Sequence, residues 1–189
     1  AMEDEYIVDL YWQRNENAIR ETELKYGPYC MKISFNILGS LQESEENVND
    51  TYLHAWQGIP PQRPKVLSAF LGKIARNLAI NRYQAERADK RGGGQFALSL
   101  DELDSSIPDA MAMDEQLDAA ALSQSINAFL RTQPRQQRQI FVRRYFYCDS
   151  VEEIAELFQI TPSKVKSALF RCRNKLRFYL EKEGYRFEA

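Results

Sequence analysis

Apolar residues recur along the chain at spacings of three and four positions, which is the period of an amphipathic α-helix. Extended alternation of β-branched and polar residues, the pattern of a strand, is missing from the sequence. The chain is therefore predicted to be all-α. The expected helices are residues 4–13, 15–37, 43–57, 64–91, 116–131, 135–147, 150–158 and 162–182. Pro28 is expected to kink or interrupt the second helix, because proline lacks an amide donor and clashes with the preceding turn.

Two stretches rich in turn-forming residues divide this helical pattern. The sequence GIPPQRP (58–64) predicts a short rigid loop, because its prolines cannot continue the preceding helix. Residues 92–115 begin with three glycines and contain no Lys or Arg, which is typical of a flexible acidic linker. We therefore expect two small helical domains, residues 2–91 and 116–183, joined by the linker 92–115.

Residues 150–177 predict a helix-turn-helix in the second domain. Ser150 and Glu153 have the spacing of a capping box, and Thr161 and Pro162 fit the cap and first position of the next helix. Two helices joined by such a short turn form the DNA-binding motif whose second helix enters the major groove.

The second helix of this motif has two distinct faces. Val165, Leu169, Cys172 and Leu176 recur at helical spacing and predict a buried stripe. Phe170 lies on the other face, where it could contact a thymine methyl while Arg171 contacts guanine. The alternative is a solvated basic helix that carries a stray phenylalanine. The candidate DNA-contacting side chains on this face are Lys166, Ser167, Phe170, Arg171, Asn174 and Arg177.

The long helix 64–91 repeats this design in the first domain. Leu67, Leu71, Ile74 and Leu78 predict its buried stripe. Its opposite face combines cations that can neutralise phosphates with Asn and Tyr groups suited to unpaired bases. That face comprises Lys73, Arg76, Asn77, Tyr83, Arg87 and Lys90. The alternative is again a surface helix with solvated charges only. The acidic segment 42–56 would repel DNA, so we assign it to a protein partner.

The formal net charge of −2 hides an alternation of charged blocks. Residues 1–58 carry −7, residues 59–94 carry +6, residues 95–130 carry −7 and residues 131–189 carry +6. Because the basic helices fall in the positive blocks, the small total does not exclude a polyanionic partner.

Little in the composition supports catalysis or metal binding. Cys30, Cys148 and Cys172 are odd in number and widely spaced, which favours reduced thiols over disulfides or a zinc site. His54 is the only histidine. We expect no catalytic residues, no metal, no cofactor and no small-molecule substrate. Neither a long apolar run nor a signal-peptide pattern is present, so we expect no membrane insertion and a cytoplasmic location.

Three segments together resemble a known family. EENVNDTYLHAWQGIPP, LSAFLGKIARNLAINRYQAERADKR and RQIFVRRYFYCDSVEEIAELFQITPSKVKSALFRCRNKLR are similar, in this order, to the bacterial RNA polymerase sigma factors of the sigma-70 family, extracytoplasmic-function (ECF) subfamily. The resemblance covers nearly the whole chain. It implies a factor that binds core RNA polymerase and directs promoter-specific initiation. Residues 2–91 would be region 2 and residues 116–183 region 4.

The resemblance also implies roles for particular residues. Glu46, Asp50 and Trp56 would bind the polymerase clamp helices. The loop 58–64 and the long helix would handle the −10 element, with Lys73, Arg76, Asn77, Asn81, Arg82, Tyr83 and Arg87 as the contacting residues. The −35 element would be bound by Ser163, Lys164, Lys166, Ser167, Phe170, Arg171 and Asn174.

The implied partners are the polymerase clamp helices and flap, promoter DNA and an anti-sigma factor, with the protein at the nucleoid. Gln159 departs from the family, which commonly has glycine in this turn, and a left-handed backbone there would cost Gln a modest amount. The alternative functions are a stand-alone helix-turn-helix regulator that acts without polymerase and a module that binds no DNA. An enzyme is the least favoured class.

Overall fold

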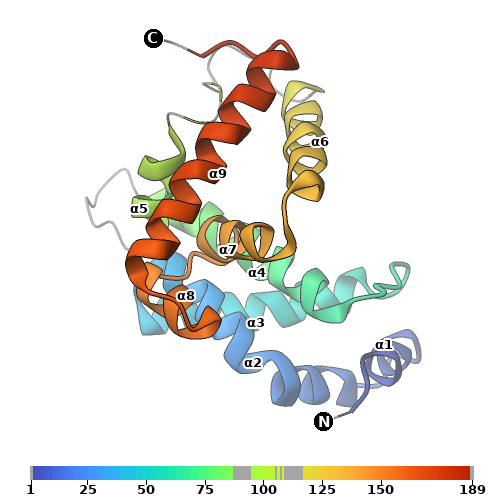
Figure 1. Cartoon of the computed structure of the whole chain (residues 1–189). Coiled ribbons are helices and arrows are strands. Elements are labelled where there is room, and N and C mark those ends of the chain that lie inside the picture. The colour runs from blue at the N-terminus through green and yellow to red at the C-terminus, as the bar shows by residue number, and fades with distance from the viewer. Residues whose placement is uncertain (1, 87–94, 105, 107, 109–116, 188–189) are drawn as a thin grey trace. The chain divides into compact units, whose positions relative to one another are not determined.

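The computed structural model describes residues 2–86, 95–104, 106, 108 and 117–187, and the regular elements in these ranges are helices (Figure 1). Their bounds are α1 (Asp4–Trp12), α2 (Asn17–Leu38), α3 (Leu41–Gly58), α4 (Leu67–Glu86), α5 (Gln95–Asp104), α6 (Leu117–Thr132), α7 (Arg135–Tyr145), α8 (Val151–Phe158) and α9 (Pro162–Lys182). The all-α prediction is confirmed.

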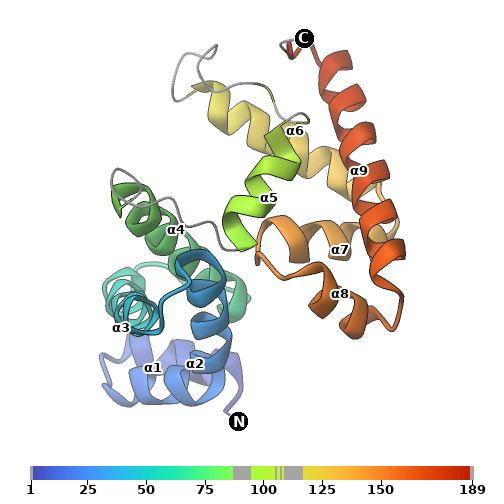
Figure 2. The ribbon, with the colours of Figure 1, turned by 90° about the vertical axis from the view of Figure 1, so that its left-hand side faces the viewer.

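The chain forms two compact units, Ala1–Gly94 and Gln95–Ala189. Helices α1 to α4 belong to the first unit and α5 to α9 to the second (Figure 2). Helix α5 lies inside the segment predicted as a flexible linker, and it packs against α7 of unit 2. Ten residues of that segment are therefore helical, whereas residues 92–94, 105, 107 and 109–115 lie outside the described ranges.

Unit 1 is a bundle in which α2, α3 and α4 pack against one another and α1 packs on α2. Its core includes Ile7, Tyr11, Ile33, Ile37, Leu67 and Leu71, all at most 2% exposed. Pro28 does not interrupt α2, because the helix continues through it from Asn17 to Leu38, and the kink expected there stays a prediction. Pro28 is exposed, and α2 packs against both α3 and α4.

The buried stripe of α4 differs from the prediction. Leu67 and Leu71 are fully buried as expected, but the stripe continues through Ala75 and Ala79, while Ile74 and Leu78 are only half-buried. Small residues occupy these positions because the α4 backbone lies close to its neighbours. The Asn47 side chain of α3, for example, donates a 3.0 Å hydrogen bond to the carbonyl of Ala75. Apolar spacing alone could not reveal this close approach.

Unit 2 contains the predicted helix-turn-helix. The hydroxyl of Ser150 accepts from the Glu153 amide at 3.2 Å and the Glu153 carboxylate accepts from the Ser150 amide at 2.8 Å, so the capping box is confirmed. Gln159 ends α8 with φ 53° and ψ 44°, the left-handed backbone that was anticipated. Thr161 caps α9 and Pro162 is its first residue.

Candidate nucleic-acid interfaces

Helix α9 separates a buried stripe from an exposed polar face. Val165, Leu169, Cys172 and Leu176 are at most 2% exposed and lie in the core of unit 2. Phe170 is 58% exposed despite its large apolar ring. The candidate −35 residues are all exposed, and we call them the α9 face: Ser163, Lys164, Lys166, Ser167, Phe170, Arg171 and Asn174. An exposed aromatic ring among cations is accessible to a binding partner.

A groove runs between the α9 face and helix α7. Ser163, Lys164, Ser167 and Arg171 line its α9 side. Gln136 and Gln137 line the α7 side, and both carry amide groups that can hydrogen-bond phosphates or base edges. Neither glutamine was predicted, because nothing in their local pattern shows that α7 lies beside α9.

The candidate −10 residues of α4 fall into an exposed row and a partly covered set. Lys73, Asn77 and Asn81 are exposed and follow one another at intervals of four, so they share one side of the helix. Arg76 and Tyr83 are half-buried and interact with other residues. The last candidate, Arg87, lies outside the described residues.

The exposed row of α4 borders a groove shared with the 58–64 loop. Lys73 and Asn77 line this groove together with Gln62 of the loop. His54 and Gln57 at the end of α3 and Phe70 of α4 complete it. The structure therefore brings together the loop and the helix that the resemblance linked to the −10 element. His54, Gln57 and Phe70 were missed, since they gain this position only when α3 packs against α4.

Arg82 is paired with two of the residues assigned to polymerase binding. Its guanidinium donates to the Glu46 carboxylate at 3.2 Å and also to the carboxylate of Asp50. The hydrogen bond to Asp50 is the largest cause that raises the pKa of Arg82. Arg82 was predicted to contact DNA, and both carboxylates were predicted to contact polymerase. In the free protein Arg82 of α4 bridges the two carboxylates of α3.

Trp56 serves mainly to pack α3 against the start of the chain. Its ring centre lies 6.1 Å from that of Tyr11, and the Arg14 guanidinium lies 5.2 Å above its indole. Arg14 also donates to the Trp56 carbonyl at 2.7 Å. These contacts leave the indole half-buried and surrounded by its own unit, which the local sequence around Trp56 could not indicate.

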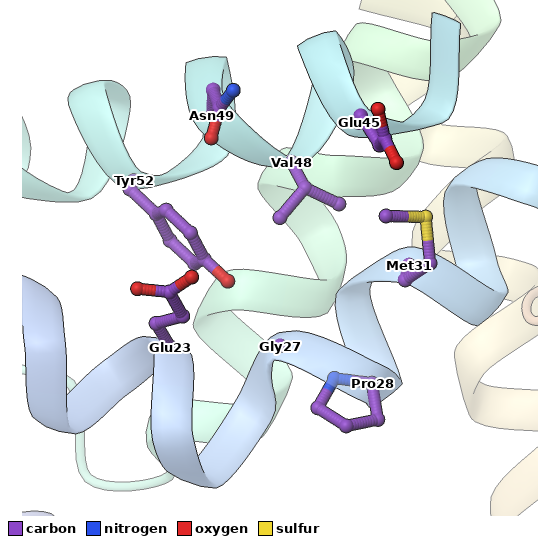
Figure 3. A pocket seen from close by; sticks show the side chains of 8 residues that line it. All are labelled: Glu23, Gly27, Pro28, Met31, Glu45, Val48, Asn49 and Tyr52. Atoms are coloured by element: carbon purple, nitrogen blue, oxygen red, sulfur yellow. The ribbon is translucent and has the colours of Figure 1, made fainter. Parts of the chain in front are cut away.

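Helices α2 and α3 form a groove with an apolar floor and an acidic rim (Figure 3). Met31, Val48 and Tyr52 supply apolar surface, and the carboxylates of Glu23 and Glu45 border it. Gly27 permits this arrangement, because a Cβ there would lie 3.2 Å from the Tyr52 hydroxyl. Such a groove suits a partner helix with apolar and basic side chains. The acidic helix α3 was predicted to bind a protein partner, but its neighbour α2 was not.

The described residues offer no group of three or more His, Cys, Asp or Glu side chains that could hold a metal ion. Cys30, Cys148 and Cys172 are separately buried, and burial raises the pKa of the Cys30 thiol to about 12 and that of Cys172 to about 11. Within the same ranges, no helix combines the length and apolar character that crossing a membrane requires.

Comparison with known proteins assigns the two units. Residues 24–88 match the family Sigma-70 region 2, and residues 124–176 match Sigma-70, region 4. The chain is 24% identical over 155 residues to the ECF RNA polymerase sigma factor SigW of Bacillus subtilis (strain 168), across 80% of this chain and 83% of that protein. The chain belongs to the sigma-70 family of RNA polymerase sigma factors, in its ECF subfamily. Such a protein binds RNA polymerase and directs promoter-specific transcription initiation, so the stand-alone regulator is not favoured.

A solved structure gives a weaker match over the whole chain. It is described as the structure of CnrH in complex with the cytosolic domain of CnrY. The likeness covers 95% of this chain and 97% of that one, at 16% identity and a TM-score of 0.44.

Proposed function

We propose that unit 2 recognises the −35 element through the α9 face, with Arg171 and Phe170 as its central contacts. The observation that carries this proposal is the 58% exposure of Phe170 beside an exposed arginine. A bidentate arginine selects guanine, and an aromatic ring selects the thymine methyl in the major groove. Gln136 and Gln137 of α7 border the same groove and would contact the DNA backbone.

Unit 1 would handle the −10 element through the groove between α4 and the 58–64 loop. Lys73 supplies a charge for phosphate, while Asn77, Phe70 and His54 supply hydrogen-bonding and stacking groups for unpaired bases. Opening of the duplex would then follow from tighter binding of single-stranded bases than of paired ones. No catalytic residue is needed for such a step.

The α2–α3 groove would receive the polymerase clamp helices, next to the exposed carboxylates of α3. Leu24, Leu41 and Leu53 are 68%, 62% and 51% exposed on the same two helices, which suits a surface that becomes covered. An anti-sigma factor would compete for this surface, and the protein would act in the cytoplasm at the nucleoid. Hydrogen exchange of α2 and α3 should slow when core polymerase is added, and unchanged exchange would exclude this surface.

The decisive experiment is run-off transcription with purified core polymerase on a promoter library, with and without the protein. Substitution Arg171→Ala should reduce the preference for the correct −35 sequence by about 1–3 kcal/mol, the discrimination of one bidentate base contact. Arg131→Ala is the matched control, because Arg131 is an exposed cation of the same unit that lies on α6 and not on α9. An equal effect of both substitutions would show non-specific phosphate binding instead.

A further inference from the structure

Helix α5 belongs to unit 2 and packs against α7. Phe96 is 4% exposed and Ser99 is 2% exposed, and the Ser99 hydroxyl donates to the Phe96 carbonyl at 2.8 Å. Leu103 packs against the core of unit 2 that also contains Phe141 and Leu176. A segment that only bridged two domains would have no reason to bury these groups. Helix α5 is therefore part of the unit that carries the α9 face.

The charge of Arg144 in α7 is compensated mainly by α5. Arg144 is 2% exposed. Its Nε and Nη2 donate to the two carboxylate oxygens of Glu102 at 3.1 and 2.7 Å, and its Nη1 donates to the Gln95 side chain at 2.8 Å. A further bond goes to the carbonyl of Asp149 at 3.0 Å. Because an unpaired buried charge is strongly unfavourable, α7 needs Glu102 in this place.

The same carboxylate also reaches helix α9. The Tyr145 hydroxyl donates to Glu102 Oε2 at 3.0 Å, and Arg173 Nη1 donates to the Tyr145 oxygen at 2.6 Å. Arg173 Nη1 also lies 3.7 Å from Glu102 Oε2. Arg173 is two residues beyond Arg171 on α9, and its side chain is only 17% exposed. One acidic side chain of α5 thus holds a cation of α7 and a cation of α9.

We propose that Glu102 is a positioning residue for −35 recognition, acting on α9 through Arg173 and Tyr145. This inference rests on the proposed function of the α9 face. Removing the carboxylate leaves two guanidiniums, Arg144 and Arg173, without the anion they share. Their mutual repulsion and the loss of the tyrosine bridge then allow α9 to shift against α7. The groove between these helices would no longer match the DNA.

The test compares Glu102→Gln with Asp101→Asn in run-off transcription on two promoters that differ only in an intact or a scrambled −35 element. Asp101 is exposed on the same helix, so its substitution removes the same charge without touching Arg144 or Arg173. We expect the intact-to-scrambled ratio to fall roughly fivefold for Glu102→Gln, within the coupling range of groups in one network. Asp101→Asn should leave the ratio unchanged.

A purely structural role of Glu102 gives a different result, since partial unfolding of unit 2 lowers the helical circular dichroism at the assay temperature together with the ratio, whereas loss of positioning lowers the ratio and leaves the dichroism unchanged. Tyr145→Phe is the second variant, because it removes only the hydroxyl that joins Glu102 to Arg173 and keeps the buried ring. It should lower the same ratio and speed amide exchange in α9. An unchanged ratio in Tyr145→Phe and Glu102→Gln, while Arg171→Ala still lowers it, refutes the positioning role alone. An unchanged ratio in Arg171→Ala refutes the proposed function.

Discussion

The substitution Gln159→Gly should stabilise unit 2. Gln159 occupies the left-handed region with φ 53° and ψ 44°, where its Cβ approaches the following carbonyl oxygen. The backbone geometry itself serves a purpose, because the Gln159 amide bonds to the carbonyls of Ala155 and Glu156 and so closes α8. The side chain is exposed, so little packing is lost with it. Glycine can keep the same turn without the steric penalty.

The expected gain is the difference between two opposing terms. Relief of the left-handed strain contributes about 1–2 kcal/mol. The greater flexibility of glycine in the unfolded chain costs about 0.5–1 kcal/mol. The net stabilisation is therefore roughly 0.5–1 kcal/mol, which corresponds to a rise of about 2–8 °C in the melting temperature of a domain this size.

The two units can be followed separately, because Trp12 and Trp56 both lie in unit 1. Tryptophan fluorescence reports the unfolding of unit 1, whereas far-ultraviolet circular dichroism reports the helices of both units. The dichroism transition that has no counterpart in fluorescence is the unfolding of unit 2. Gln159→Gly should raise the midpoint temperature of this transition. Gln159→Ala is the control, because it removes the side chain but keeps the Cβ. Equal stabilisation by Ala and Gly would refute the backbone explanation.

Three further outcomes follow from contacts in both units. Gly72→Ala should destabilise unit 1 by about 1–3 kcal/mol in urea titrations, because a Cβ there would lie 3.2 Å from Tyr29 Cζ and closer still to its hydroxyl; Tyr29→Phe should restore part of the loss. Burial alone would raise the pKa of Glu102, but its bonds with Arg144 and Tyr145 and the charge of Arg173 lower it below the usual value. The Glu102 contribution is therefore present at neutral pH and is lost as acid protonates the folded state. On acidification below the ordinary carboxyl range of about pH 4, the melting temperature of unit 2 should therefore fall more steeply in the native protein than in Glu102→Gln. Arg82→Gln should change the stability of unit 1 by at most about 1 kcal/mol in the same titrations, because its partners are partly exposed; a larger loss would show that the pair is a main support of α3 against α4.

Local features of the helix-turn-helix could be predicted from sequence, since the signals lie within a few residues of one another. The capping box at Ser150, the cap at Thr161 and the outward position of Phe170 all follow from spacing along one or two helices. The left-handed backbone at Gln159 followed from comparison with the family's usual glycine. Each of these features depends on residues that are close in the sequence and not on contacts with distant parts of the chain.

Features that depend on distant contacts were missed. Helix α5 is short and follows three glycines. Its Glu102 pairs with Arg144, which lies 42 residues further along the chain. The pairing of Arg82 with Glu46 spans 36 residues and joins two sets that sequence reasoning had assigned to different partners. The shift of the α4 stripe from Ile74 to Ala75 likewise reflects how closely α3 approaches. Pattern gives the faces of a helix, but tertiary packing decides which neighbour each face meets.

The burial of all three native thiols makes this protein well suited to site-specific labelling. Cys30 and Cys148 are 0% exposed and Cys172 is 2% exposed, so a maleimide dye would reach them slowly in the folded state. A cysteine introduced at Glu183 of unit 2 or at Ala69 of unit 1, both exposed, would then react first. A fluorophore pair placed at these two positions would report the separation of the two units by energy transfer, with every native cysteine left in place.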